Sequence, residues 1–116
     1  MFDFEKLQVY NKAKAFNKEV YKFLQNSNLD NTTKNQLRRA SFSIMLNIAE
    51  GSGRDSRADK RHFYVMSRGS TFECVAIFDY LKDINTLSEE SFIAFYKMLD
   101  ELSRMLYGLM QTLNKK

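Results

Sequence analysis

The last part of the chain carries the pattern that most restricts its fold. Apolar residues recur there at alternating spacings of three and four positions: Phe92, Phe95, Leu99, Leu102, Leu106, Leu109 and Leu113. This spacing places all of them along one side of a helix, as in the seams of packed helices. Ser88 precedes two glutamates, which is typical of a helix N-terminus, and Lys115 and Lys116 follow at the end that favours cations. The pattern predicts a helix over residues 89–114 whose apolar side other helices must cover.

Three earlier segments repeat the helical period. The first, over residues 5–25, has the stripe Val9, Ala13, Phe16, Val20 and Phe23. The second, over residues 32–50 with Asp30 or Asn31 as its N-cap, has the stripe Leu37, Ser41, Ile44 and Ile48. The third, over residues 57–85, has the stripe Phe63, Met66, Ser70, Glu73, Ile77, Tyr80 or Leu81, and Ile84. Each stripe predicts an amphipathic helix.

The connections between these segments determine the topology. Gly51 is placed to end the second helix in a left-handed conformation, and Ser56 with Asp59 provides an N-cap for the third. The chain contains no proline, which suits long uninterrupted helices. Short connections make successive helices antiparallel neighbours. The sequence therefore predicts an all-α, antiparallel, up-and-down four-helix bundle that forms a single domain over residues 1–116.

The composition argues against several classes of protein. With 44% hydrophobic and 28% charged residues, the chain is typical of a soluble globular domain. No segment has the roughly 18 uncharged residues of a membrane helix, and the N-terminus lacks the features of a signal peptide. We therefore expect a cytoplasmic protein without membrane contact. The single cysteine, Cys74, excludes an internal disulfide. No spacing of His, Cys and carboxylates suggests a metal or cofactor, and the turn at Gly51 and Gly53 lacks the lysine of a phosphate-binding loop.

The third segment contains residues that are unusual in a helix stripe. Glu73 falls among apolar positions, so we expect it to form a buried ion pair with Arg38 or Arg39 that sets the helix register, with a catalytic acid as the alternative. Gly69 lies mid-segment, where either a closely packed neighbouring backbone or an exposed position explains it. Cys74 is expected to be a core thiol. Because no acid–base pair or activated nucleophile is evident, the sequence predicts a protein that is not an enzyme.

The net charge of +4 is concentrated in the middle of the chain. The candidate contacts to nucleic acid are Arg38 and Arg39 in the second predicted helix, and Arg54, Arg57, Lys60 and Arg61 around the connection to the third. Arginine suits this role because its planar group donates two parallel hydrogen bonds to a phosphate. The alternative is that these cations only belong to a solvent-exposed connection between two helices and bind no ligand.

Three stretches resemble a known family. They are FEKLQVYNKAKAFNKEVYKF near the start, QLRRASFSIMLNIAEGSGR in the middle and FYVMSRGSTFE in the third predicted helix. The last two are similar to the patterns QLRRAA.SI..NIAEG.GR and F...A.GS..E of the 23S rRNA intervening-sequence proteins. Members of that family are small bacterial four-helix bundles, and a similar bundle is the accessory protein of retroelement reverse transcriptases.

The resemblance implies a homo-oligomer that binds rather than catalyses. Relatives form closed five-fold rings, and the retroelement relative binds nucleic acid through a basic surface. A pentameric ring needs two unlike surfaces on each subunit, for which the resemblance suggests Tyr10, Tyr21, Tyr96, Met98 and Met105. A ring would repeat each copy's cations and strengthen weak contacts to RNA or DNA phosphates. The alternative is a scaffold or accessory subunit that holds a protein partner and has no direct role with nucleic acid.

Overall fold

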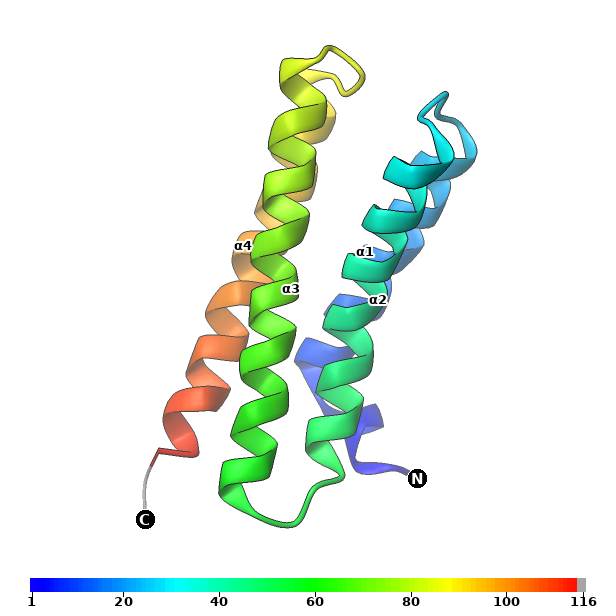
Figure 1. The fold of residues 1–116 in the computed structure, drawn as a ribbon. Helices are drawn as coiled ribbons and strands as arrows, with labels where there is room; N and C mark the ends of the chain where they lie inside the picture. Colours follow the sequence, from blue (N-terminus) through cyan, green and yellow to red (C-terminus); the bar gives the residue numbers. More distant parts are fainter. Residues whose placement is uncertain (115–116) are drawn as a thin grey trace.

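The computed structural model describes residues 1–114, which form four α-helices preceded by a short 3-10 helix. The elements are η1 (Asp3–Lys6), α1 (Gln8–Gln25), α2 (Asn31–Ser52), α3 (Arg57–Asp83) and α4 (Glu89–Thr112). Successive helices run antiparallel, and the α2–α3 loop lies at the same end of the bundle as the N-terminus (Figure 1). The predicted all-α up-and-down bundle is confirmed. Lys115 and Lys116, which we expected to favour the end of the last helix, lie outside the described residues.

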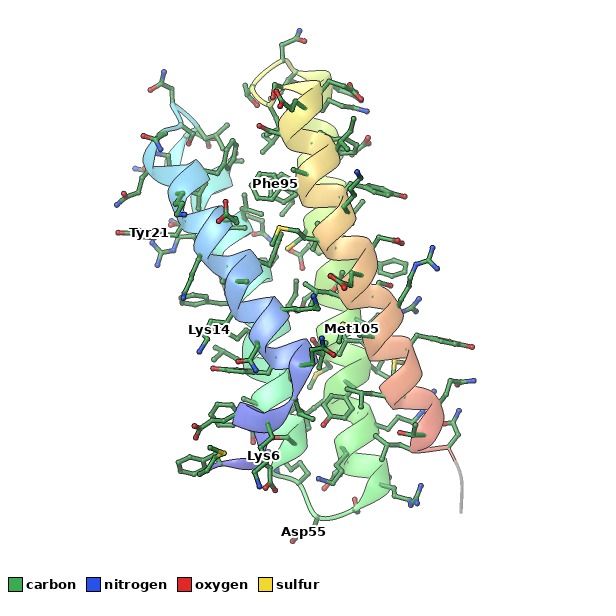
Figure 2. The ribbon with its side chains drawn as sticks, turned by 180° about the vertical axis from the view of Figure 1, so that it is seen from behind. Lys6, Lys14, Tyr21, Asp55, Phe95 and Met105 are labelled. Atoms are coloured by element: carbon green, nitrogen blue, oxygen red, sulfur yellow. The ribbon has the colours of Figure 1, made fainter. Side chains whose placement is uncertain are left out.

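Aromatic contacts between helices form the centre of the core. The rings of Phe78 on α3 and Phe95 on α4 are stacked, with centroids 4.3 Å apart. Phe16 on α1 meets both rings edge-on, at centroid distances of 6.4 and 6.1 Å. Figure 2 shows Phe95 and Met105 between α1 and α4. Because these rings are buried and come from three helices, each helix covers the apolar side of the others.

The predicted stripes of α2 and α4 agree closely with the buried residues. All four stripe residues of α2 are buried: Leu37, Ser41, Ile44 and Ile48. On α4 the buried residues are Phe95, Leu99, Leu102, Leu106 and Met110. The other three predicted positions of α4, Phe92, Leu109 and Leu113, are partly buried against the core. A regular spacing of large aliphatic residues was therefore sufficient to orient these two helices.

The predicted stripe of α3 is wrong by about one residue. The residues that α3 buries are Tyr64, Ser67, Thr71, Cys74, Phe78 and Leu81. Ser67 and Thr71 are buried in place of Met66 and Ser70 of the expected stripe. Helix α3 packs close to α2, and short polar side chains fit this contact. The hydroxyl of Ser67 donates to the carbonyl oxygen of Ile44 at 2.7 Å, and that of Ser70 donates to the hydroxyl of Ser43 at 2.7 Å.

The structure changes the expected role of Gly51 and decides between the two alternatives for Gly69. Gly51 lies inside α2 rather than in a left-handed cap, and it is buried against α3. A Cβ atom added there would lie 3.0 Å from the Cβ of Phe63 and 3.0 Å from a ring carbon of Tyr64. Gly69 is exposed and has nothing within 4 Å of such an atom, so close packing does not explain it. Within residues 1–114 the residue with positive φ is Asn85, just beyond α3, at 64°.

The expected serines cap α3 and α4, whereas Asp30 is the N-cap residue of α2 without a side-chain capping hydrogen bond. The Ser56 hydroxyl accepts a hydrogen bond from the Asp59 amide at 3.0 Å, and the Ser88 hydroxyl accepts one from the Ser91 amide at 3.1 Å. These contacts confirm both N-caps. The first predicted helix is divided, because Leu7 has extended backbone angles and separates η1 from α1.

Candidate nucleic-acid interface

Positive charge is concentrated on one half of the bundle. Helices α1 and α2 together contain seven Lys or Arg residues and two Asp or Glu residues. Helices α3 and α4 contain seven Lys or Arg residues and eight Asp or Glu residues. Helix α1 contacts α2 and α4, and α3 contacts the same two helices. Figure 1 shows α1 and α2 together on one side of the bundle and α3 and α4 on the other. A polyanion would therefore meet a favourable field on the α1–α2 layer.

Three lysines account for much of the charge on α1. Lys14, Lys18 and Lys22 are exposed and follow one another at intervals of four residues, so they lie along one side of the helix. Lys22 also lies 3.5 Å from Glu19, an exposed contact of small energy. Figure 2 shows Lys14 and Tyr21 extending from α1 on the side away from α4. Sequence analysis missed these lysines, although their regular spacing was visible.

The two predicted arginines of α2 join this surface. Arg38 and Arg39 are both exposed, and the guanidinium of Arg38 lies over the Phe42 ring at 5.7 Å from its centroid. The side-chain amide of Asn17 donates to the carbonyl oxygen of Ser41 at 2.8 Å. Because α1 and α2 are antiparallel, this bond places Arg38 and Arg39 at the level of the α1 residues that follow Asn17. Lys18 and Lys22 are in this stretch. We call Lys14, Lys18, Lys22, Arg38 and Arg39 the basic layer.

The cations around the α2–α3 loop have partners within the protein. Arg54 pairs with Glu50 and lies over the Phe63 ring at 4.6 Å. Arg57 donates to the carbonyl oxygen of Thr112 at 3.0 Å, and Lys60 donates to that of Ser52 at 2.9 Å. Both carbonyls belong to the last residue of a helix, where cations and donors are favourable. These side chains stabilise the ends of α2 and α4.

The six predicted contact residues do not form one cluster. Arg61 is half-buried, and its Nε atom has no hydrogen-bond partner within the described part of the chain. Arg38 and Arg54 are separated by most of α2, a distance of about 20 Å at the rise of an α-helix. The structure thus groups Arg38 and Arg39 with the α1 lysines, and places the other four at one end of the bundle.

The predicted ion pair of Glu73 is wrong. Glu73 is exposed, and its carboxylate accepts a hydrogen bond from the side-chain amide of Gln36 rather than from Arg38 or Arg39. The cause is the shift of the α3 stripe: Cys74 occupies the interior position that we assigned to its neighbour. Glu73 and Gln36 still join α3 to α2, but at the surface.

Cys74 is a buried thiol whose environment favours its unreactive, protonated form. Its side chain is fully shielded from solvent, and burial raises the pKa of the thiol from 9.0 to about 12, with the charge of Glu73 as a smaller cause. The thiol therefore stays protonated at neutral pH, which removes its nucleophilic form. Within residues 1–114 there is no group of three or more His, Cys, Asp or Glu side chains arranged to hold a metal. No helix in this range is long and apolar enough to cross a membrane.

A match to a protein family decides the identity of the chain. The 23S rRNA-intervening sequence protein family matches residues 5–108, which is most of the sequence. This chain belongs to that family. The resemblance seen in its three motifs is confirmed. A search of curated proteins found no match to this intervening-sequence protein.

A solved relative shares the architecture of this intervening-sequence protein. It is a protein of unknown function from the S23 ribosomal protein family of Bacteroides thetaiotaomicron, whose crystal structure was determined at 1.70 Å resolution. The two superimpose with a TM-score of 0.82 over 88% of this chain and 97% of the other, at 23% sequence identity. At this identity the likeness supports the four-helix fold and carries no function with it.

Proposed function

We propose that this protein is a non-enzymatic homo-oligomer that binds the phosphates of RNA or DNA through the basic layer of α1 and α2. The observation that carries the proposal is the unequal charge of the two layers: α1 and α2 have five more cations than acids, whereas α3 and α4 have one more acid than cations. The cations of the basic layer are exposed and extend over both helices. Contacts of this kind read phosphates and carry little base specificity.

The assembly part of the proposal is a ring, and the expected pentamer rests on the family resemblance. Because a ring consists of identical copies, it repeats the basic layer around its circumference. Each copy adds its net charge of +4. Phosphates along one nucleic acid can then contact several copies, and the effective concentration of the second site strengthens binding beyond that of a single copy.

The test measures affinity for a fluorescent RNA or DNA oligonucleotide across a range of salt concentrations. We expect the logarithm of the association constant to fall linearly with the logarithm of salt concentration. The double variant Lys22→Gln with Arg39→Gln should reduce the steepness of that line by about 1.5, because each lost phosphate contact removes ~0.7–0.9. Affinity that does not change with salt would refute phosphate binding.

The matched control removes the same charge from the other layer. Lys82→Gln with Lys97→Gln takes two cations from α3 and α4, and we expect it to leave the salt dependence almost unchanged. A third variant, Arg54→Gln with Arg57→Gln and Lys60→Gln, tests the loop. Since these side chains already contact Glu50, Thr112 and Ser52, we expect a smaller effect from it than from the basic-layer variant.

A further inference from the structure

Two large aromatic rings are exposed among the cations of the basic layer, and phosphate binding leaves them unexplained. Tyr21 on α1 and Phe42 on α2 are 54% and 45% exposed. Tyr21 lies in the chain between Lys18 and Lys22, and the guanidinium of Arg38 lies over the Phe42 ring. Figure 2 shows Tyr21 extending from α1 on the side away from α4. The basic layer is therefore aromatic as well as cationic.

The contact between α1 and α2 brings the two rings onto one surface. The Asn17–Ser41 hydrogen bond marks a common level of these antiparallel helices. At about 1.5 Å per residue, Tyr21 lies about 6 Å from that level in one direction and Phe42 about 1.5 Å in the other. The inner edge of the contact is the core, so these exposed rings lie at its outer edge. They are about 7–8 Å apart along the bundle axis, with Arg38 close to the level of Tyr21.

Both rings are held by neighbouring side chains on their own helices. The side-chain amide of Gln25 donates to the hydroxyl of Tyr21 at 2.7 Å. Arg38 is one turn from Phe42 on α2, and its guanidinium is 5.7 Å from the centre of that ring. A flat guanidinium is itself a surface on which a base can stack. Because these groups are ordered before a ligand arrives, binding costs less conformational entropy.

A ligand that matches this surface must combine flat aromatic groups with repeated negative charge. A nucleic-acid strand with unpaired bases has both properties. A duplex has the charge, but its bases are already stacked at intervals of about 3.4 Å inside the helix. Bases stacked on each other cannot each cover one of two rings about 7–8 Å apart, whereas the splayed bases of a single strand can. A wholly apolar partner would have to bury the surrounding cations without compensation.

We propose that the basic layer binds single-stranded RNA or DNA, with unpaired bases stacked on Tyr21 and Phe42. Lys18 and Arg38, whose levels fall between those of the two rings, contact the phosphates that join those bases. The proposal rests on the phosphate binding of the proposed function and adds the class of nucleic acid that the same site takes. Every base has a flat face, so stacking selects unpaired strands without selecting a sequence.

The experiment compares three fluorescent probes by polarisation at one salt concentration: a single strand, the duplex that it forms with its complement, and an abasic strand of equal length. The abasic strand has the same phosphates and no bases. We expect the wild type to bind the single strand more tightly than both other probes. Tyr21→Ala with Phe42→Ala should weaken single-strand binding by about 30-fold, or about 5-fold per ring, because each stacked base contributes at least ~1 kcal/mol. Its affinity for the duplex and for the abasic strand should not change.

Two further variants separate stacking from other effects of the substitutions. Tyr21→Phe with Phe42→Tyr keeps both rings and should keep the preference for the single strand. Phe72→Ala with Tyr80→Ala removes two rings of α3 that are 57% and 60% exposed, and it should bind all three probes as the wild type does. Helical circular-dichroism spectra check that each variant is folded. The alanine variant of Tyr21 and Phe42 should keep the wild-type salt dependence, because it removes no phosphate contact.

The outcomes distinguish this inference from the proposed function. Salt-dependent binding that is equal for the three probes would overturn base stacking and leave phosphate binding in place. A lower particle mass of the alanine variant of Tyr21 and Phe42, measured by light scattering without nucleic acid, would assign these rings to a contact between copies and overturn their stacking role. The absence of binding to every probe would overturn both proposals.

Discussion

Ser67 on α3 donates its hydroxyl to the carbonyl oxygen of Ile44 on α2 at 2.7 Å, and both residues are fully shielded from solvent. The hydrogen bond crosses the contact between the two helices at a position where a short side chain is required. It shows how a polar residue becomes part of the core: its single donor has a partner, so its burial carries no unsatisfied group.

The Ser67 hydroxyl should contribute measurably to stability. We expect Ser67→Ala to lower the free energy of unfolding by about 1 kcal/mol, the usual net value of such a hydrogen bond. Ser67→Leu should cost more, since extra atoms must fit between α2 and α3. Urea denaturation followed by circular dichroism checks both. Ser70→Ala, which loses only a half-buried contact to the Ser43 hydroxyl, is the comparison and should cost less than Ser67→Ala.

The two helical glycines, Gly51 and Gly69, should respond in opposite directions to alanine. Gly51→Ala places a Cβ atom 3.0 Å from the Cβ of Phe63, which cannot move without its helix, so we expect destabilisation by roughly 1–3 kcal/mol. Gly69→Ala meets nothing and gains helix propensity, so it should stabilise by up to about 1 kcal/mol. Thermal and urea unfolding of both variants measure the difference. Equal effects at the two positions would contradict the packing of α2 on α3.

Burial of Cys74 predicts a pH dependence of stability. The thiol has a pKa of about 12 when folded and an ordinary value of 9.0 when unfolded. Below pH 9 both states hold the proton and the thiol contributes nothing. Between pH 9 and 12 the unfolded chain loses a proton that the folded protein keeps. Stability should therefore fall as pH rises, by at most about 1.4 kcal/mol per pH unit from this group.

The variant Cys74→Ala isolates the contribution of the thiol. Tyr64 also has a raised pKa because of burial, so the wild type and the variant will both lose stability at high pH. The difference between their free energies of unfolding should shrink as pH rises above 9. A difference that stays constant from pH 7 to 11 would show that the thiol is not desolvated. A thiol reagent gives a second measurement, since native Cys74 should react only after unfolding.

The stacked pair of Phe78 and Phe95 should be the largest single contribution to the core. Phe95→Ala removes a ring that touches Phe16, Phe23 and Phe78, so we expect a loss of about 3–5 kcal/mol in the free energy of unfolding. Tyr80→Ala is the matched control, because that ring is 60% exposed on α3 and should cost under about 1 kcal/mol. Comparable losses of unfolding free energy from the two variants would contradict the position of Phe95 in the core.

The sequence by itself determined the helices, their order and their antiparallel topology. These features follow from local causes: the recurrence of large apolar residues, the serine caps and the absence of proline. The stripes of α2 and α4 could be assigned because leucine and isoleucine side chains mark one side of each helix clearly. The basic residues of α2 could be found for the same reason, since a charged side chain is exposed wherever the helix face is known.

Only the tertiary structure decided which small residues are buried and which cations have internal partners. Ser67, Thr71 and Gly51 carry no hydrophobic signal, and they lie inside because the surfaces of α2 and α3 fit closely there. The interior position of Cys74 then turned Glu73 outward. Arg57 and Lys60 on α3 donate to carbonyl groups at the ends of other helices, Thr112 on α4 and Ser52 on α2. These contacts therefore depend on how the helix ends meet. Apolar periodicity is a property of one helix, whereas close approach is a property of two.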